Sequence, residues 1–126
     1  AAPSLRGQVL LVEDEASVRA FMTELLENHG LAVTAFSDPR AAQAELAERA
    51  AAFDLAIFDQ AMPYRTGLEL AHEARACCAD LPVVIYTGYA ADLSEQRANE
   101  AGVRAVLRKP LDVPGFIGLL DELLPD

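Results

Sequence analysis

Hydrophobic residues in this chain gather in five short runs, and between the runs hydrophobic and polar positions recur with the period of a helix. The runs consist of aliphatic, β-branched and aromatic residues, which is typical of strands. They cover residues 9–12, 32–36, 55–58, 83–86 and 105–107. The first, third and fourth runs are almost continuously hydrophobic, as expected of central parallel strands that are covered on both faces.

A helical pattern follows each of these runs. From Val18 to Leu26 hydrophobic residues recur at the spacing of an amphipathic helix, which is predicted to stop near Gly30. Asp38 followed by Pro39 predicts a capped helix start, and that helix should run to about residue 49. The remaining helices are expected over residues 68–79, 93–101 and 113–123.

A strand followed by a helix, repeated five times with short connections, predicts a single α/β domain. Its sheet should be parallel, with helices on both faces and right-handed crossovers. We expect the domain to occupy residues 8–126 and residues 1–7 to be the end of a linker. Because the first residue is not Met, we also expect the chain to be a piece of a longer protein.

Polar residues stand where four of the five strands end. Glu13 and Asp14 follow the first strand and Asp59 follows the third, while Thr87 and Lys109 follow the fourth and fifth. In open α/β sheets the chemistry lies outside the carboxyl ends of the strands. The sequence therefore predicts that three carboxylates, a hydroxyl and an ammonium group meet at one edge of the sheet.

These groups suit the chemistry of phosphate. Clustered carboxylates repel one another unless a cation lies among them, and a set made only of oxygen ligands favours a hard ion such as Mg²⁺. A lysine and a hydroxyl beside the metal would complete the groups needed for phosphoryl transfer. Asp59 is the best candidate for the nucleophile, because a carboxylate can form an acyl phosphate.

Composition and charge narrow the choice of partners. The formal charge of −10 argues against nucleic acid, since binding to phosphate backbones needs a basic surface. No apolar stretch of 18 residues and no signal peptide is visible, so we expect no direct membrane contact. Cys77 and Cys78 are adjacent, which suits neither a zinc site nor a redox pair, and we expect a cytoplasmic, reducing environment.

Four segments together resemble a known family. They are VLLVEDE at residues 9–15, FDLAIFDQAMPYRTG at 53–67, VVIYTGYA at 83–90 and VLRKPL at 106–111. In this order and at these spacings the chain resembles the receiver domains of two-component response regulators over about residues 8–124. The resemblance implies a flavodoxin-like (βα)5 fold with strand order 2-1-3-4-5. It also implies that the domain takes a phosphoryl group from a histidine kinase or a histidine phosphotransfer protein.

The resemblance also implies a role for each site residue. Asp59 matches the phosphoacceptor. Glu13 and Asp14 match the acidic pair that holds Mg²⁺, with Asp14 a direct ligand and Glu13 acting through water. The backbone carbonyl of Ala61, two residues after the acceptor, would also bind the ion.

The remaining family positions lie near the fourth and fifth strands. Thr87 matches the hydroxyl that moves to bond the phosphoryl oxygens, and Lys109 matches the lysine that pairs with them. Lys109–Pro110 resembles a peptide bond that is cis in the family. Tyr89 occupies a position that modulates access of water to the acyl phosphate.

One departure concerns the switch and the parent protein. The family often has Tyr or Phe three residues before the lysine, where this chain has Val106. In the family that aromatic moves together with the hydroxyl residue, here Thr87, and this coupled movement is therefore left open for this chain. The segments TGYA and VLRKPL, which lack that aromatic, resemble those of receivers attached to hybrid sensor histidine kinases. His72 lacks the context of a phosphorylatable kinase histidine and is interpreted as an exposed helix residue.

Several alternative functions are compared with this prediction. The first alternative is a stand-alone, single-domain response regulator. A phosphatase with an aspartyl-phosphate intermediate would need an acid where Ala61 stands. The acidic residues after the first strand argue against a flavin carrier, and the complete set of site residues argues against a receiver that only docks.

We therefore expect self-phosphorylation and dephosphorylation as the domain's activity, with no kinase core in this chain. The identity of the partner kinase and a weak homodimer are left open.

Overall fold

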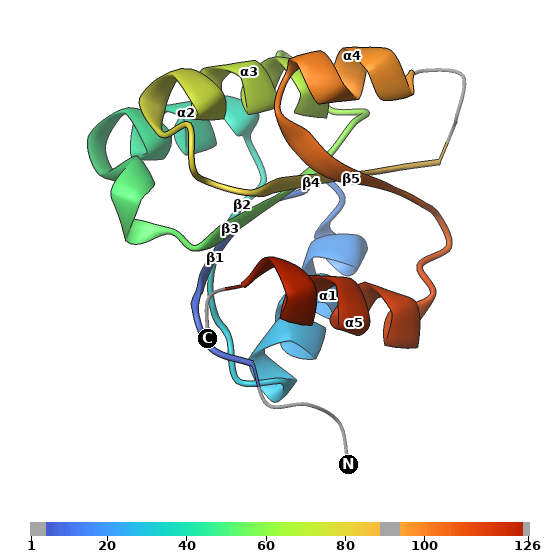
Figure 1. Ribbon diagram of the computed structural model, residues 1–126. Helices are drawn as coiled ribbons and strands as arrows, with labels where there is room; N and C mark the ends of the chain where they lie inside the picture. The colour runs from blue at the N-terminus through green and yellow to red at the C-terminus, as the bar shows by residue number, and fades with distance from the viewer. Residues whose placement is uncertain (1–4, 89–93, 125–126) are drawn as a thin grey trace.

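The computed structural model describes residues 5–88 and 94–124 (Figure 1). The strands are β1 Gln8–Val12, β2 Ala32–Phe36, β3 Leu55–Asp59, β4 Val83–Thr87 and β5 Val103–Arg108. The helices are α1 Ala16–Asn28, α2 Pro39–Arg49, α3 Gly67–Cys77, α4 Glu95–Glu100 and α5 Val113–Leu123, with a short 3-10 turn, η1, at Ala50–Ala52. The predicted alternation of strands and helices is confirmed.

The element boundaries differ from the sequence prediction at a few points. β3 and β4 extend one residue further than predicted, so that Asp59 and Thr87 are the last residues of their strands. β5 begins at Val103, two residues earlier than expected. Ser94 caps α4 by accepting a hydrogen bond from the Arg97 N–H, while the predicted start of this helix at Leu93 lies outside the described residues.

The strands form one parallel sheet in the order β2-β1-β3-β4-β5, as predicted. Helices α1 and α5 cover one face, and α2, α3 and α4 cover the other (Figure 1). None of the helices within 5–88 and 94–124 combines the length and hydrophobicity that a membrane crossing needs.

Each face of the sheet has its own hydrophobic core. Leu11, Ile57 and Val84 belong to the core beneath α1 and α5, whereas Leu10 and Phe58 belong to the core beneath α2, α3 and α4. Successive side chains of a strand point to opposite faces. Polar residues two positions beyond the members of one core therefore continue the same face toward the edge of the sheet.

Candidate functional site

Three acidic side chains meet at the carboxyl edge of the sheet. Glu13, Asp14 and Asp59 each offer a carboxylate oxygen, and these oxygens lie within 4.8 Å of one another. Glu13 has 0% of its surface exposed and Asp59 has 3%, while Asp14 is exposed. The predicted meeting of the three carboxylates at this edge is thus found in the structure.

Lys109 reaches into this cluster from the end of β5. Its Nζ lies 3.3 Å from Asp59 Oδ1 and 4.0 Å from Glu13 Oε1. The Lys109 N–H donates a hydrogen bond of 3.0 Å to the carbonyl of Thr87, which ties the lysine to β4. The Lys109–Pro110 peptide bond is cis, as the family resemblance implies.

The buried carboxylate oxygens of the cluster lack hydrogen-bond donors among the described residues. Both Glu13 oxygens and Asp59 Oδ1 are buried and accept no hydrogen bond from another described residue. Burial first, and then the neighbouring Asp59 carboxyl, raises the pKa of Glu13 to about 8. Three carboxylates this close together, with one lysine among them, fit a hard divalent cation, which takes oxygen ligands and keeps several waters.

Three other residues singled out from the sequence, Thr87, Ala61 and Val106, are among those that the structure describes. Thr87 is buried at the end of β4. Ala61 is exposed in the loop between β3 and α3. Val106 is partly buried and packs against the core beneath α2, α3 and α4, so an aliphatic side chain fills the place of the family's aromatic. Tyr89 lies outside the described residues.

Gln60 holds the loop that follows Asp59, a role that the sequence analysis missed. Its N–H donates to the carbonyl of Tyr86 at 3.1 Å, and its carbonyl accepts from the Gly67 N–H at 3.2 Å. Its side-chain Oε1 accepts from the Leu68 N–H at 2.9 Å. The residue next to Asp59 therefore joins β3 to both β4 and the start of α3.

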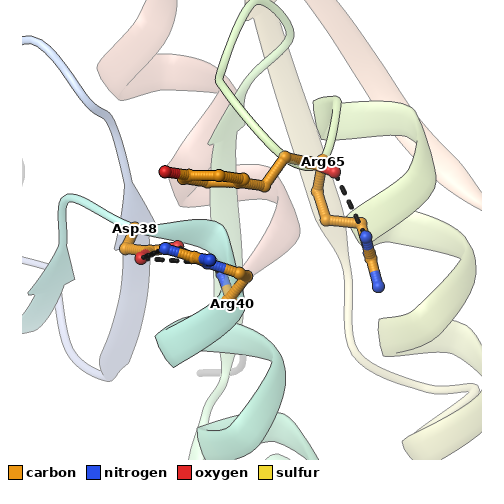
Figure 2. Close-up of polar contacts among 4 residues, drawn as sticks. Asp38, Arg40 and Arg65 are labelled. Carbon is orange, nitrogen blue, oxygen red and sulfur yellow. Dashed lines mark hydrogen bonds and ion pairs between the residues drawn. The ribbon is translucent and has the colours of Figure 1, made fainter.

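A second set of contacts holds the far side of the same loop (Figure 2). Tyr64 has a φ of 72°, a conformation that bulky residues rarely adopt, and the Arg40 guanidinium lies 3.5 Å from its ring centroid. Asp38 fixes that guanidinium through a 2.8 Å ion pair, and it also caps α2, as predicted. Arg65 pairs with Glu73 at 3.0 Å and donates to the Tyr64 carbonyl.

Sequence periodicity could not reveal this contact. Arg40 and Tyr64 are far apart in the chain, and their contact depends on a single left-handed residue in a loop. The one local signal is a tyrosine directly after Met62–Pro63, in a turn where small residues are usual.

The fold and the site together define a doubly wound α/β domain that gathers three carboxylates and a lysine at the carboxyl edge of its sheet. A family model for the response regulator receiver domain matches residues 9–120. The chain belongs to this family.

Relatives of known name agree with this assignment. The chain is 31% identical over 117 residues to the response regulator receiver protein CpdR of Brucella abortus and covers 96% of its length. It is 32% identical over 114 residues to the transcriptional regulatory protein PdtaR of Mycobacterium tuberculosis, of which it spans 55%.

Among solved structures, the receiver domain of the hybrid histidine kinase CckA is 30% identical, with a TM-score of 0.78. That likeness covers 94% of this chain and 100% of the CckA domain.

Proposed function

We propose that this domain is a phosphorylation switch whose acceptor is Asp59. The observation that carries the proposal is the position of Asp59 among Glu13, Asp14 and Lys109, with its Oδ1 3.3 Å from the lysine Nζ. A carboxylate oxygen of Asp59 attacks the phosphorus of a phosphohistidine on the partner. The P–N bond breaks, its electron pair stays on the imidazole nitrogen, and an aspartyl phosphate forms.

The residues around Asp59 have separate roles in this transfer. Mg²⁺, when bound, neutralises charge on the transferring phosphoryl oxygens. Asp14, Asp59 and the carbonyl of Ala61 would hold it directly, and Glu13 through water. Lys109 supplies a second positive charge to those oxygens, and the Thr87 hydroxyl donates a hydrogen bond to one of them.

The output is a change in the surface formed by α4, β5 and α5. Thr87 ends β4 and its carbonyl accepts from the Lys109 N–H, so a movement of either residue is transmitted to β5. Phosphorylation shifts an equilibrium between two arrangements of this surface. Val106 takes part as an aliphatic residue packed against the core, rather than as a swinging ring.

For the parent protein we propose a hybrid sensor histidine kinase, with a histidine kinase or histidine phosphotransfer protein as the phosphodonor. The motif wording and the likeness to the CckA receiver support this origin. The alternative, a stand-alone regulator, is supported by the match to 96% of the length of CpdR. A cytoplasmic location is proposed with either origin, and the two free cysteines, Cys77 and Cys78, agree with it.

Incubation with phosphoramidate tests the proposed chemistry. Wild-type protein with Mg²⁺ should gain one phosphoryl group by intact-mass measurement, and EDTA should prevent the gain. Asp59→Asn should gain none, whereas Asp121→Asn, an exposed change of equal charge on α5, should react like wild type. Equal labelling of wild type and Asp59→Asn would refute the assignment.

A further inference from the structure

Tyr86 stands in a row of side chains that crosses the sheet at the site. Asp59 on β3 is the register partner of Tyr86 on β4, and Glu13 follows Val12, whose partner is Phe58. Lys109 lies two residues beyond Leu107, which is the partner of Tyr86 on β5. Leu11, Ile57 and Leu107, which stand two residues before Glu13, Asp59 and Lys109, belong with Tyr86 to the core beneath α1 and α5. Because every second side chain points to the same face, all four residues of the row share that face.

The ring of Tyr86 supports the path of the lysine. Neighbouring strands are about 4.8 Å apart, so the Lys109 side chain must pass over β4 to reach Asp59 on β3. Its Nζ lies 4.8 Å from the centroid of the Tyr86 ring and 3.3 Å from Asp59 Oδ1. The face of an aromatic ring attracts an ammonium group at this distance. The ring therefore supports the Lys109 side chain where it passes over β4 toward Asp59.

The hydroxyl of Tyr86 is buried and has no hydrogen-bond partner among the described residues. Tyr86 is 1% exposed, and its oxygen, like both oxygens of Glu13, forms no hydrogen bond with another described residue. Buried tyrosine hydroxyls usually find a partner. A tyrosine hydroxyl carries one proton that it can donate, so it can serve as a hydrogen-bond donor to a carboxyl oxygen.

We propose that Tyr86 is a positioning residue of the phosphoacceptor site, whose hydroxyl donates to a carboxyl oxygen of Glu13 while its ring holds Lys109 against Asp59. This inference rests on the proposed function. With one Glu13 oxygen held by Tyr86, the other is left for the hydration shell of the metal. Phenylalanine at position 86 would keep the aromatic ring beside Lys109 but lose the hydroxyl donor. Leucine at this position would lose both.

Titration of the protein with Mg²⁺ alone, followed by amide chemical shifts, tests the role of the hydroxyl. Tyr86→Phe should bind Mg²⁺ about tenfold more weakly than wild type, the usual effect of losing a group that orients a metal ligand, with the thermal unfolding midpoint unchanged. Thr34→Val, which removes a hydroxyl from β2, a strand that contributes no residue to this row, should bind like wild type.

The outcomes separate this inference from the proposed function. If wild type binds Mg²⁺ and Tyr86→Phe binds it equally well, the positioning role is wrong while the phosphoacceptor proposal stands. If wild type binds no Mg²⁺, the proposed function fails and takes this inference with it.

A second measurement tests the role of the ring, and its deciding result comes from the wild-type protein. The Lys109 side-chain protons next to Nζ should be shifted upfield by the ring current in wild type. They should stay so in Tyr86→Phe and return to ordinary values in Tyr86→Leu. Ordinary values in wild type would overturn the role of the ring.

Discussion

Glu13 shows at the scale of single residues how the site holds more acid than a protein interior normally allows. A fully buried carboxylate is costly unless it is paired or neutral. Here Lys109 lies 4.0 Å away, and carboxylate oxygens of Asp14 and Asp59 lie within 4.8 Å. In the absence of a metal ion the cluster lowers this cost by keeping the Glu13 proton.

This proton makes the stability of the metal-free protein depend on pH. The folded protein holds the Glu13 proton up to about pH 8, whereas an unfolded chain releases it near pH 4.5. The folded state therefore binds more protons between these values. The free energy of unfolding should fall as pH rises through this window, by an amount on the order of a few kcal/mol.

Urea unfolding in EDTA at several pH values measures this dependence. Glu13→Gln carries no titratable proton at this position, so its unfolding free energy should change less across the same window. A wild-type stability that rises between pH 5 and 8, which are roughly the limits set by the two pKa values, would contradict the account of Glu13.

At the scale of elements, the junction of β3 and α3 fixes the position of Asp59. Thr66 accepts a hydrogen bond from the Glu69 N–H, and the Glu69 side chain accepts one from the Thr66 N–H, so the helix begins with a complete capping box. Gly67 is the first residue of α3, and a Cβ there would lie 2.7 Å from the backbone oxygen of Asp59. The helix can start this close to Asp59 only because Gly67 has no side chain.

Gly67→Ala should therefore disturb the site through the backbone. The added methyl group must push against the Asp59 carbonyl, and overpacking of this kind destabilises by about 1–3 kcal/mol. The reaction of Asp59 with phosphoramidate should slow as well, because its backbone is displaced. Urea unfolding and the rate of labelling measure the two effects.

Gly118→Ala is the matched control for this substitution. Gly118 lies within α5, and a Cβ there would meet no atom within 4 Å. Alanine is the better helix former, so this variant should be more stable by roughly 0.5–1 kcal/mol and should react like wild type. If the two variants behave alike, the contact between Gly67 and Asp59 does not constrain the acceptor.

At the scale of the whole molecule, the arrangement of the fold and most of the site could be predicted from the sequence. The strands of a parallel sheet with short crossovers end at the same edge. The residues at the strand ends were therefore enough to predict that Asp14, Asp59 and Lys109 lie close together. The row that includes Tyr86 could not be predicted in this way. It depends on the register between strands, and in the sequence Tyr86 looks like any other strand aromatic.

Gln60 and the stack of Arg40 on Tyr64 were missed for a related reason. Both depend on the path of the loop after β3, including one residue with a φ of 72°, and hydrophobic periodicity carries no information about such a path. The boundaries of β3 and β4 were also one residue short, since a polar residue at the last position ends the apolar pattern before the hydrogen-bonded strand ends.

Binding of a divalent cation should stabilise the molecule as a whole. An ion that binds only the folded state at about 100 times its dissociation constant adds about 2.7 kcal/mol to the free energy of unfolding. Mg²⁺ should therefore raise the unfolding midpoint of wild type, and EDTA should reverse the rise. Asp14→Asn should lose most of this response, whereas Asp121→Asn should keep it. An equal Mg²⁺ response in both variants would place the ion elsewhere.

The most direct test of the central claim is to locate the phosphoryl group. Protein phosphorylated in the presence of Mg²⁺ is reduced with borohydride, which converts an acyl phosphate into a primary alcohol, and the product is mapped by tandem mass spectrometry. The account predicts homoserine at position 59 and an unmodified Asp14. A reduced residue at position 13 or 14, or a reduction-resistant phosphoester on Thr87, would contradict it.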